Sequence, residues 1–568
     1  MMDIARSHAM FGAVTWRRMA SLCLGALLYL FSGNVSQAQQ ADDEKRSMLG
    51  ALTDNVRVET QGGANDAPAT SDTESWTQSI AVDGFAEGGI AINPAMPFNG
   101  LNWGQLYTDR ANTPIFNSGV LTAQRPLTSK EETFDYGFKL QGMIGEDVRY
   151  NHYMGQLDYL IPSRTQVGLI EAHALMHIPV KSPLTEGGVD IKVGQFVTLN
   201  GAELIIAKDN LFYSHAYMFN FGPFLDTGVM VTNHAKSWLD IYTGVISGNN
   251  MFVGWPGDNN HAVDFHGGFG FNFFDGDLVI MAITTTGPEN AKQTDKYGAG
   301  WPTGFVNDAT PWLPGGWPYA TAPGWPATAS MSAWGTPSQC ACAVNSAIRS
   351  WNNLTTTWKA AENLFFITDI SFMVDTGWNP STFGFPYKSW TAANAALGAQ
   401  NPANGSFFGA APARPMGVTA YGVAQNVSYK LDDVWLVKAR LEYFRDANNF
   451  FVSGYPGYYG NANAQHGFWD PSIINRNNTN LPGGWTPAGT ATQTGTAYTG
   501  TSYLALTLGA TITPKLPENT PYLSGLMFRP ELRWDQAVNG MTPFFNKNGM
   551  SASQGLINMD IILPFTLL

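Results

Sequence analysis

Apolar and polar residues alternate along most of this chain with the two-residue period of a β-strand. In 363–376 one face carries Leu364, Phe366, Thr368, Ile370, Phe372 and Val374, and the other carries Asp369, Ser371 and Asp375. Successive side chains of a strand point to opposite faces of its sheet, so each such segment predicts a strand with one apolar and one polar face. We expect sixteen strands, at 77–92, 114–126, 133–145, 165–178, 188–200, 226–235, 237–248, 262–274, 277–288, 349–360, 363–376, 416–430, 433–446, 501–513, 523–537 and 552–567.

The polar faces of the later strands carry rows of charge. In 433–446, Trp435, Val437, Ala439, Leu441 and Tyr443 oppose Lys438, Arg440 and Glu442, and in 523–537, Leu526, Phe528, Leu532 and Trp534 oppose Arg529, Glu531, Arg533 and Asp535. Such a row cannot face hydrocarbon, where a Lys or Arg costs about 2–4 kcal/mol at the bilayer midplane. It cannot line a dry protein core either. A water-filled lumen on one side and lipid on the other accommodate both faces.

The connections between the expected strands alternate in length. Short ones lie around 127–132, 181–187, 236, 276, 361, 432 and 514–521, and long ones at 93–113, 146–164, 201–225, 249–261, 289–348, 377–415, 447–500 and 538–551. Short periplasmic turns, long extracellular loops and an even strand number are typical of outer-membrane barrels. The pattern therefore predicts an all-β fold, a transmembrane antiparallel up-and-down β-barrel of about 16 strands, with 14 or 18 as the limits.

Alternation alone does not exclude a soluble β-sandwich or propeller, whose apolar faces would also be buried. Strand length, the signs of export and aromatic residues at strand ends favour the membrane; these aromatics are Tyr136, Trp435, Tyr443 and Trp534. The last strand is amphipathic, as outer-membrane chains usually end, although its aromatic is Phe565 and the terminal residue is Leu568.

The N-terminus predicts export. Arg17 and Arg18 precede the apolar run 22–31, and Ser36-Gln37-Ala38 offers small residues for cleavage, so we expect 1–38 to be a signal peptide. Residues 39–75 are polar and are expected to form a flexible periplasmic segment before a barrel at 76–568. No later apolar run approaches the ~18 residues of a transmembrane helix.

The composition of the chain argues against several classes of function. The formal net charge of −13 makes nucleic acid a poor partner. After cleavage only Cys340 and Cys342 remain, as a loop disulfide or as free thiols, and there is no second cysteine pair for zinc. His173 and His177 would lie ~13 Å apart on a strand, too far to share a metal ion. We predict no metal and no cofactor.

Little in the chain favours an enzyme. Ser214 and His215 are adjacent, so on a strand they would point to opposite faces, and no G-x-S-x-G segment occurs. Five tryptophans lie in the Pro-rich loop 301–336, where either a sugar-stacking site or a self-packed lid would suit them.

The segment 201–225 is the third long loop and is rich in aromatic residues, which argues against disorder. We expect it to fold into the mouth or lumen, with Glu203, Asp209 and Asp226 opposite Lys438, Arg440, Arg529 and Arg533. The two charge groups would then create a transverse field at a constriction. Scattered, solvated lumen charge is the alternative. Glu442, Glu531 and Asp535 complete the expected pore-lining residues.

Several segments together resemble the OmpL-like family of β-barrel porins. They are QLYTDRANTPIFNSGVLTAQRPL (105–127), VDIKVGQFVTLNGAE (189–203), NLFYSHAYMFNFGPFLDTGV (210–229), GDNNHAVDFHGGFGFNFFDG (257–276), TTTGPEN (284–290), VKARLEYFRDANNFF (437–451) and FRPELRWDQA (528–537). The resemblance covers nearly all of the expected mature chain and implies an outer-membrane pore without catalytic residues. The chain departs from the family at 301–336 and in the loops 377–415 and 447–500, which leaves the solute open.

We therefore predict an outer-membrane porin for passive diffusion of small hydrophilic solutes and ions, since sixteen strands leave an aqueous channel. Its partners would be membrane lipids, its solutes and, by analogy with pores of this size, two further copies in a homotrimer. A substrate-specific channel, for example for a sugar, and a surface-interaction barrel plugged by its own loops are the alternatives.

Overall fold

The protein is described by a computed structural model over residues 76–98, 100–127, 133–151, 153, 156, 165–253, 262–288, 348–375, 418–447, 451–452, 500–517, 520 and 523–567. The expected signal peptide and periplasmic segment, the Trp-rich loop 301–336, Cys340 and Cys342 lie outside these residues. Among the described residues, no helix has both the length and the apolar character needed to cross a membrane.

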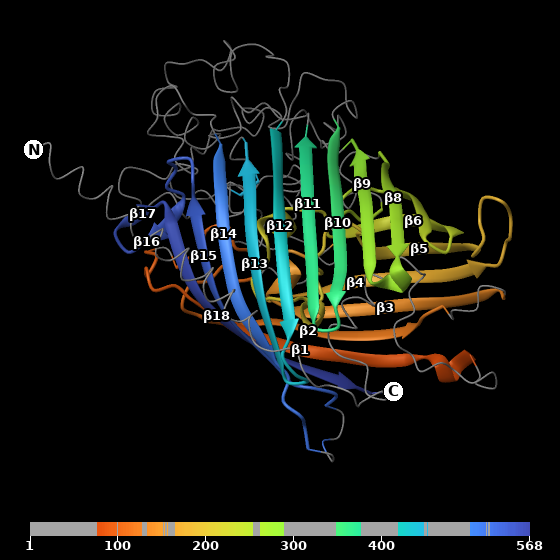
Figure 1. The fold of residues 1–568 in the computed structure, drawn as a ribbon, viewed down its shortest axis with the longest axis horizontal. Helices are drawn as coiled ribbons and strands as arrows, with labels where there is room; N and C mark the ends of the chain where they lie inside the picture. The colour runs from red at the N-terminus through yellow and green to blue at the C-terminus, as the bar shows by residue number, and fades with distance from the viewer. Residues whose placement is uncertain are drawn as a thin grey trace, which may run out of the picture. The chain divides into compact units, whose positions relative to one another are not determined.

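Sixteen antiparallel strands close into one barrel, as the alternation predicts. They are β1 (Ala81–Ile92), β2 (Pro114–Arg125), β3 (Asp135–Gly145), β4 (Gln166–Ile178), β5 (Val189–Val197), β6 (Leu225–Lys236), β7 (Leu239–Ile246), β8 (Asp264–Phe273), β9 (Leu278–Gly287), β10 (Arg349–Ala361), β11 (Leu364–Asp375), β12 (Val418–Lys430), β13 (Trp435–Asp446), β14 (Thr501–Ile512), β15 (Met527–Ala537) and β18 (Ser553–Thr566). Each strand pairs with its neighbours in chain order, and neighbouring strands of the barrel run side by side in Figure 1.

The barrel closes through its first and last strands. β1 pairs with β18 over ten residues, from Asp83 opposite Thr566 to Ile92 opposite Ile557. A 3₁₀ helix, η1 (Trp76–Ser79), precedes β1, so the first strand begins later than the alternation suggests. The last long loop holds a short hairpin that the sequence pattern did not reveal, β16 (Phe544–Asn546) with β17 (Gly549–Ser551).

The Asp-Gly turn between β8 and β9 shows how a short connection is made. Phe274 and Asp275 have φ of 55° and Gly276 has φ of 96°. Positive φ values at a tight turn match the right-handed twist of the two flanking strands, and Asp and Gly are among the residues that tolerate them best. The short connection expected around 276, between the strands expected at 262–274 and 277–288, is confirmed.

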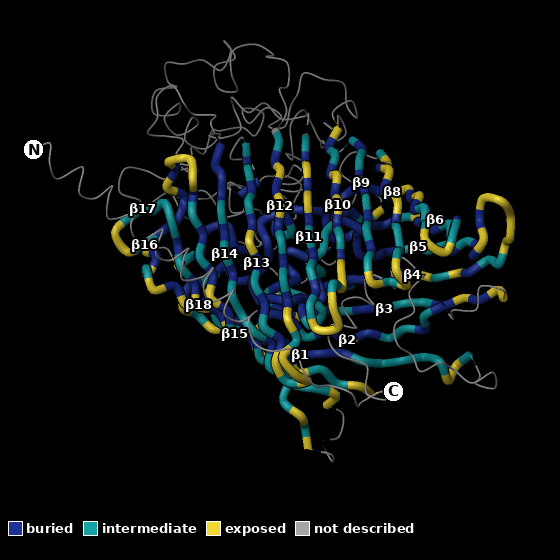
Figure 2. Tube along the Cα trace, in the orientation of Figure 1, coloured by how far each residue is buried: buried dark blue, intermediate teal, exposed yellow. Residues whose placement is uncertain are grey.

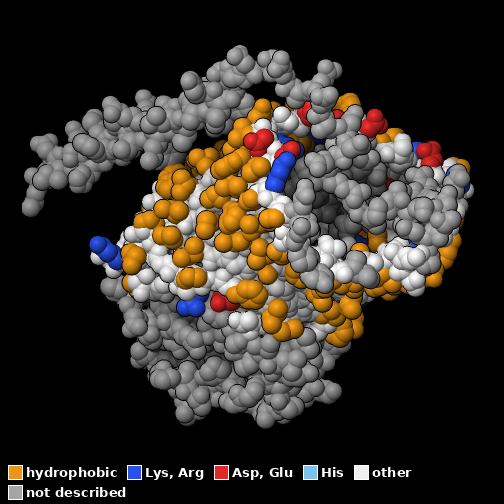
Figure 3. Space-filling model, turned by 90° about the horizontal axis from the view of Figure 1, so that it is seen from below, with side chains coloured by type: hydrophobic (Ala, Val, Ile, Leu, Met, Phe, Trp, Pro, Cys, Tyr) orange, Lys and Arg blue, Asp and Glu red, His pale blue; other side chains and the backbone are white. Residues whose placement is uncertain are grey.

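The two faces of the wall differ as predicted. Leu441 and Leu532 point outward with 53% and 57% of their surface exposed, whereas Arg440 and Arg533 point inward with 1% and 2% exposed. The same alternation of exposed and buried residues is visible along β10 to β12 in Figure 2. In Figure 3 hydrophobic side chains cover much of the described surface seen from below, and few charged ones interrupt them. An apolar outer face of this kind suits a hydrocarbon surrounding.

Replacing Leu441 by Arg tests this assignment. Leu441 lies at the middle of β13 and faces outward, so we expect the variant to lose about 2–4 kcal/mol of unfolding free energy in lipid vesicles. Trp435→Arg, at the end of the same strand, is the matched control and should cost about 0–1 kcal/mol. Urea titration in vesicles measures both. Equal losses at the two positions would contradict a lipid-facing wall.

Candidate functional site: the interior of the barrel

The loop between β5 and β6, residues 198–224, lies inside the barrel, and we call it the lumen loop. It leaves β5, contacts His266 of β8 and Thr285 of β9 through Leu199 and Asn200, and then meets the inward faces of β10 and β11. The backbone N–H of Gly201 donates to the Asn353 side chain at 3.0 Å, and that of Ala202 donates to Asp369 at 2.9 Å. These contacts confirm that the third long loop folds inward, as we expected.

Glu203 is the first charged residue of the lumen loop and makes the contact we expected of it. Its Oε1 lies 2.6 Å from Nη1 of Arg440 on β13. Its Oε2 lies 2.9 Å from Nδ1 of His215 and accepts the backbone N–H of Ala216 at 3.0 Å. Arg440 is held in turn by Glu442, whose Oε1 accepts from its Nε at 2.8 Å. Glu203 thus joins two parts of the lumen loop to the barrel wall.

Electrostatics keeps Glu203 ionised. Burial alone would raise the pKa of this carboxyl group, but the Arg440 guanidinium and the His215 ring lower it to about 2. Glu203 is therefore an anion at neutral pH and matches the cation that it contacts.

Two further carboxylates of the wall bind the backbone of the lumen loop. The two oxygens of Glu531 on β15 accept the N–H groups of Tyr213 and Ser214, at 3.0 and 3.1 Å. Glu442 accepts the N–H of Tyr217 at 2.9 Å. Such charge-assisted bonds are stronger than bonds between neutral groups, and they fix the position of the loop.

Two arginines bind loop carbonyl groups in the same way. Nη1 of Arg529 donates to the carbonyl oxygens of Ala207 and Asn210, both at 2.7 Å, and Nη1 of Arg533 donates to that of His215 at 2.9 Å. Asp560 on β18 faces Arg529, with 3.1 Å between Oδ1 and Nε. The wall therefore presents both carboxylates and guanidinium groups to the loop backbone.

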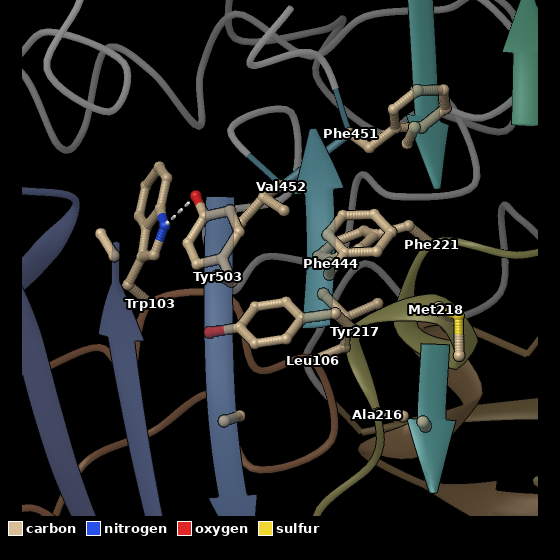
Figure 4. Packing of buried hydrophobic residues seen from close by; sticks show 14 of the residues in the cluster. Trp103, Leu106, Ala216, Tyr217, Met218, Phe221, Phe444, Phe451, Val452 and Tyr503 are labelled. Carbon is tan, nitrogen blue, oxygen red and sulfur yellow. Dashed lines mark hydrogen bonds between the residues drawn. The ribbon is translucent and has the colours of Figure 1, made fainter. Parts of the chain in front are cut away.

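Aromatic packing holds the second half of the lumen loop. The ring of Tyr217 stacks on Tyr503 and on Phe444, with centroids 4.7 and 5.8 Å apart (Figure 4). The Trp103 indole, from the loop between β1 and β2, donates to the Tyr503 hydroxyl at 3.2 Å. Phe221 and Met218 belong to the same buried cluster. Residues of several loops and strands thus form an apolar core inside the barrel.

The lumen loop also reaches the first two strands of the barrel. The Tyr213 hydroxyl donates to the side chain of Asn117 on β2 at 2.9 Å. Its ring lies over Gly89 of β1, where a Cβ atom would come within 2.5 Å of it. A glycine at this position therefore makes room for the tyrosine.

One expectation about the charge rows is wrong. We expected the inward charges of β13 and β15 to be solvated or to face a water-filled constriction, but Arg440, Arg529 and Arg533 are all buried. Their partners are wall carboxylates and the lumen loop. The physical reason is that the loop lies directly on these strands and replaces water as the source of hydrogen bonds.

Other candidate residues lie elsewhere than we expected. Asp209 pairs with its neighbour Lys208 at 2.8 Å and not with the basic residues of β13 or β15. Asp226 lies beside His266, 3.6 Å from its Nε2. The strands β13 and β15 are not adjacent, because β14 lies between them. Lys438 donates to Thr511 at 2.6 Å, and Asp535 pairs with Arg533 at 2.9 Å.

The partners of the lumen loop and of the wall arginines that sequence reasoning missed include Asn353, Asp369, Asp560 and Glu87. All four lie at inward positions of strands, so the alternation could have identified them as lumen-facing. Nothing in the sequence showed that the loop would reach them.

The histidine and serine residues that the sequence offered for a metal or catalytic site lie in two different parts of the barrel. His173 and His177 are buried on β4, and Nδ1 of His177 lies 2.5 Å from Oδ1 of Asp190. Ser214 and His215 lie on the lumen loop rather than on a strand, and the Ser214 hydroxyl accepts from Arg440 at 3.3 Å. Among the described residues, no group of three or more His, Cys, Asp and Glu side chains could hold a metal ion.

The sequence matches the family described as "Putative beta-barrel porin-2, OmpL-like" over residues 79–565. The chain belongs to this family of porins. Together with the closed barrel, membership makes the protein an outer-membrane porin. No curated protein sequence matches the chain.

Solved porin structures are similar to this porin at low identity. An anion-selective porin from Comamonas acidovorans is 8% identical, with 86% of this chain and 99% of that chain covered and a TM-score of 0.42. OprB of Pseudomonas putida is 12% identical, with 86% and 95% covered and a TM-score of 0.42. The channel DcaP of Acinetobacter baumannii is 9% identical, with 86% and 97% covered and a TM-score of 0.39. At these scores the similarities carry no further argument.

Replacing Arg440 by Met tests the anchoring of the lumen loop. The variant leaves Glu203 and Glu442 buried without their cation, so we expect a loss of about 3–5 kcal/mol of unfolding free energy. Hydrogen exchange of the amides at 201–216 should also rise. Lys359→Met is the control, because it removes an exposed ion pair with Asp277 and should cost about 0–1 kcal/mol. Unchanged exchange in the loop would show that Arg440 does not hold it.

Proposed function

We propose that this porin is a channel for the passive diffusion of small hydrophilic solutes and ions, and that the lumen loop narrows it. The observation that carries the proposal is the position of the lumen loop. This loop, one of the long connections, lies inside the barrel among the charged side chains of the inward face. Polar contacts from β10, β11, β13 and β15 fix its backbone. A fixed narrowing in a polar lumen selects solutes by size and charge and requires no reaction.

In this proposal the expected constriction residues divide by role. Glu203, Arg440, Glu442, Arg529, Glu531 and Arg533, with Asp535 beside Arg533, set the position of the loop and hence the width of the lumen. Lys438 supports Phe212 of the loop, with its Nζ 4.9 Å from the ring centroid. Asp209 lies on the loop itself, and Asp226 lies on β6, just after the loop. We further propose export with loss of residues 1–38 and assembly as a homotrimer.

One observation favours a second function. The inward arginines are buried, and the aromatic cluster around Tyr217 packs residues of several loops inside the barrel. A barrel plugged in this way could act as a surface-interaction protein instead of a channel.

Planar bilayer recording of the purified porin separates these functions. Stepwise conductance that grows linearly with salt supports a diffusion channel. Saturable block by one added sugar would favour a substrate-specific channel. A folded protein that inserts without conducting would overturn the channel proposal and favour the plugged barrel.

Loosening the lumen loop should widen the channel. In Glu531→Ala, the N–H groups of Tyr213 and Ser214 lose their acceptor, so we expect higher and noisier single-channel conductance than in the wild type. Glu186→Gln changes an exposed carboxylate at the turn between β4 and β5 and should conduct like the wild type. Identical conductance in all three proteins would mean that the loop does not limit flow.

A further inference from the structure

The charged side chains inside the barrel fall into two groups that differ in their access to water. On β13, β15 and β18 the side chains of Arg440, Arg533 and Asp560 have no exposed surface. On β1, β3 and β5 the inward residues Asp83, Lys139 and Lys192 are half-buried, and the Lys139 side chain is 23% exposed. Only the second group can act on a passing solute through water.

These accessible charges gather in one region. Lys139 pairs across β3 and β4 with His173, and His173 pairs across β4 and β5 with Gly194, two residues from Lys192. On β1, Asp83 pairs with Thr122 of β2, and Thr122 pairs with Gln141 of β3, two residues from Lys139. Lys208 and Asp209 of the lumen loop are also near enough for their charges to act on the Asp83 carboxyl group. The Lys208 side chain is 32% exposed. Asp83 is the third residue of β1, and β1 begins on the side of the barrel that carries the short turns. The group therefore lies toward that side.

Lys192 differs from the other two lysines in its pairing. Lys139 contacts Glu171 at 2.6 Å, and Lys208 contacts Asp209 at 2.8 Å. The ammonium group of Lys192 instead lies 5.5 Å from the ring centroid of Phe196. Within the part of the chain that the structure describes, no carboxylate lies within ion-pair distance of it. Its positive charge is therefore not neutralised by a direct partner.

A fixed charge in a narrow aqueous space raises the local concentration of ions of opposite sign. A buried ion pair has little effect at a distance, because the fields of its two opposite charges largely cancel. The buried arginines therefore contribute little to ion preference, although they dominate the sequence pattern. The half-buried charges on β1, β3 and β5 are then the candidates for setting it.

We propose that Lys192, with Lys139 and Asp83, sets the charge preference of the channel, and that Lys192 is the point of attraction for small anionic solutes. This inference rests on the proposed function, because it requires that the porin conducts. It differs from a transverse field between the lumen loop and the arginines of β13 and β15, which would place selectivity at Arg440 and Arg529.

Reversal potentials across a KCl gradient in planar bilayers test the proposal. Removing one unit charge that acts on an ion over one Debye length, about 8 Å at physiological ionic strength, should change the chloride-to-potassium permeability ratio about twofold or more. We expect the ratio to fall in Lys192→Gln and to rise in Asp83→Asn. Lys236→Gln is the matched control, because Lys236 pairs with Glu186 at an exposed turn, and its ratio should equal that of the wild type.

Cysteine labelling gives a second and independent reading. In a Cys340→Ser, Cys342→Ser background, Lys192→Cys should react with a negatively charged methanethiosulfonate, and its conductance should then change. Lys236→Cys should react without a change in conductance. Heat-dependent mobility on SDS gels confirms that each variant is folded.

The outcomes separate the two proposals. Conducting Lys192→Gln and Asp83→Asn variants with the wild-type permeability ratio would overturn this inference and leave the channel function intact. A folded wild-type porin that does not conduct would overturn the proposed function, and this inference would fall with it.

Discussion

Three buried guanidinium groups impose the strongest constraint on the interior of this barrel. Moving a charge out of water costs several kcal/mol unless other groups replace the lost hydrogen bonds. Arg440, Arg529 and Arg533 lie on the inward face and have lost almost all contact with solvent. Their replacements come from two sources, the carboxylates of the wall and the carbonyl and side-chain oxygens of the lumen loop. The loop therefore has to occupy one position, because only there do its acceptors meet these donors.

The lumen loop has the reciprocal requirement. A buried stretch of irregular backbone leaves N–H and C=O groups without the partners that a helix or strand would provide. Glu442 and Glu531 accept three of its N–H groups, and Arg529 and Arg533 donate to three of its carbonyls. Wall and loop thus satisfy each other, which explains why an inward loop is compatible with rows of charge. The aromatic cluster around Tyr217 adds apolar contact between loop and wall. Such contact fixes the orientation of the loop less strictly than the hydrogen bonds do.

The barrel itself could be predicted almost completely from the sequence. Side-chain alternation has a strict period of two, so Leu441 and Arg440 must face opposite sides once β13 exists. The Asp-Gly turn after β8 and the paired lengths of the connections gave the order of the strands. Glu203 could be predicted as a partner of the basic strands, because it is the first carboxylate of an inward loop. Asp209 does not contact those strands, because it pairs with its neighbour Lys208. An irregular loop has no period from which the directions of its side chains could be predicted.

Access to water could not be predicted from alternation at all. The pattern assigns Lys192 and Arg440 to the same inward side and gives no reason to distinguish them. The difference arises from long-range packing, since the lumen loop lies on β13 and leaves Lys192 on β5 half-buried. A charge under the loop determines where the loop stays, and a charge beside it determines what an approaching ion experiences. Basic residues at inward strand positions can therefore serve stability in one place and selectivity in another, according to which strands the third loop covers.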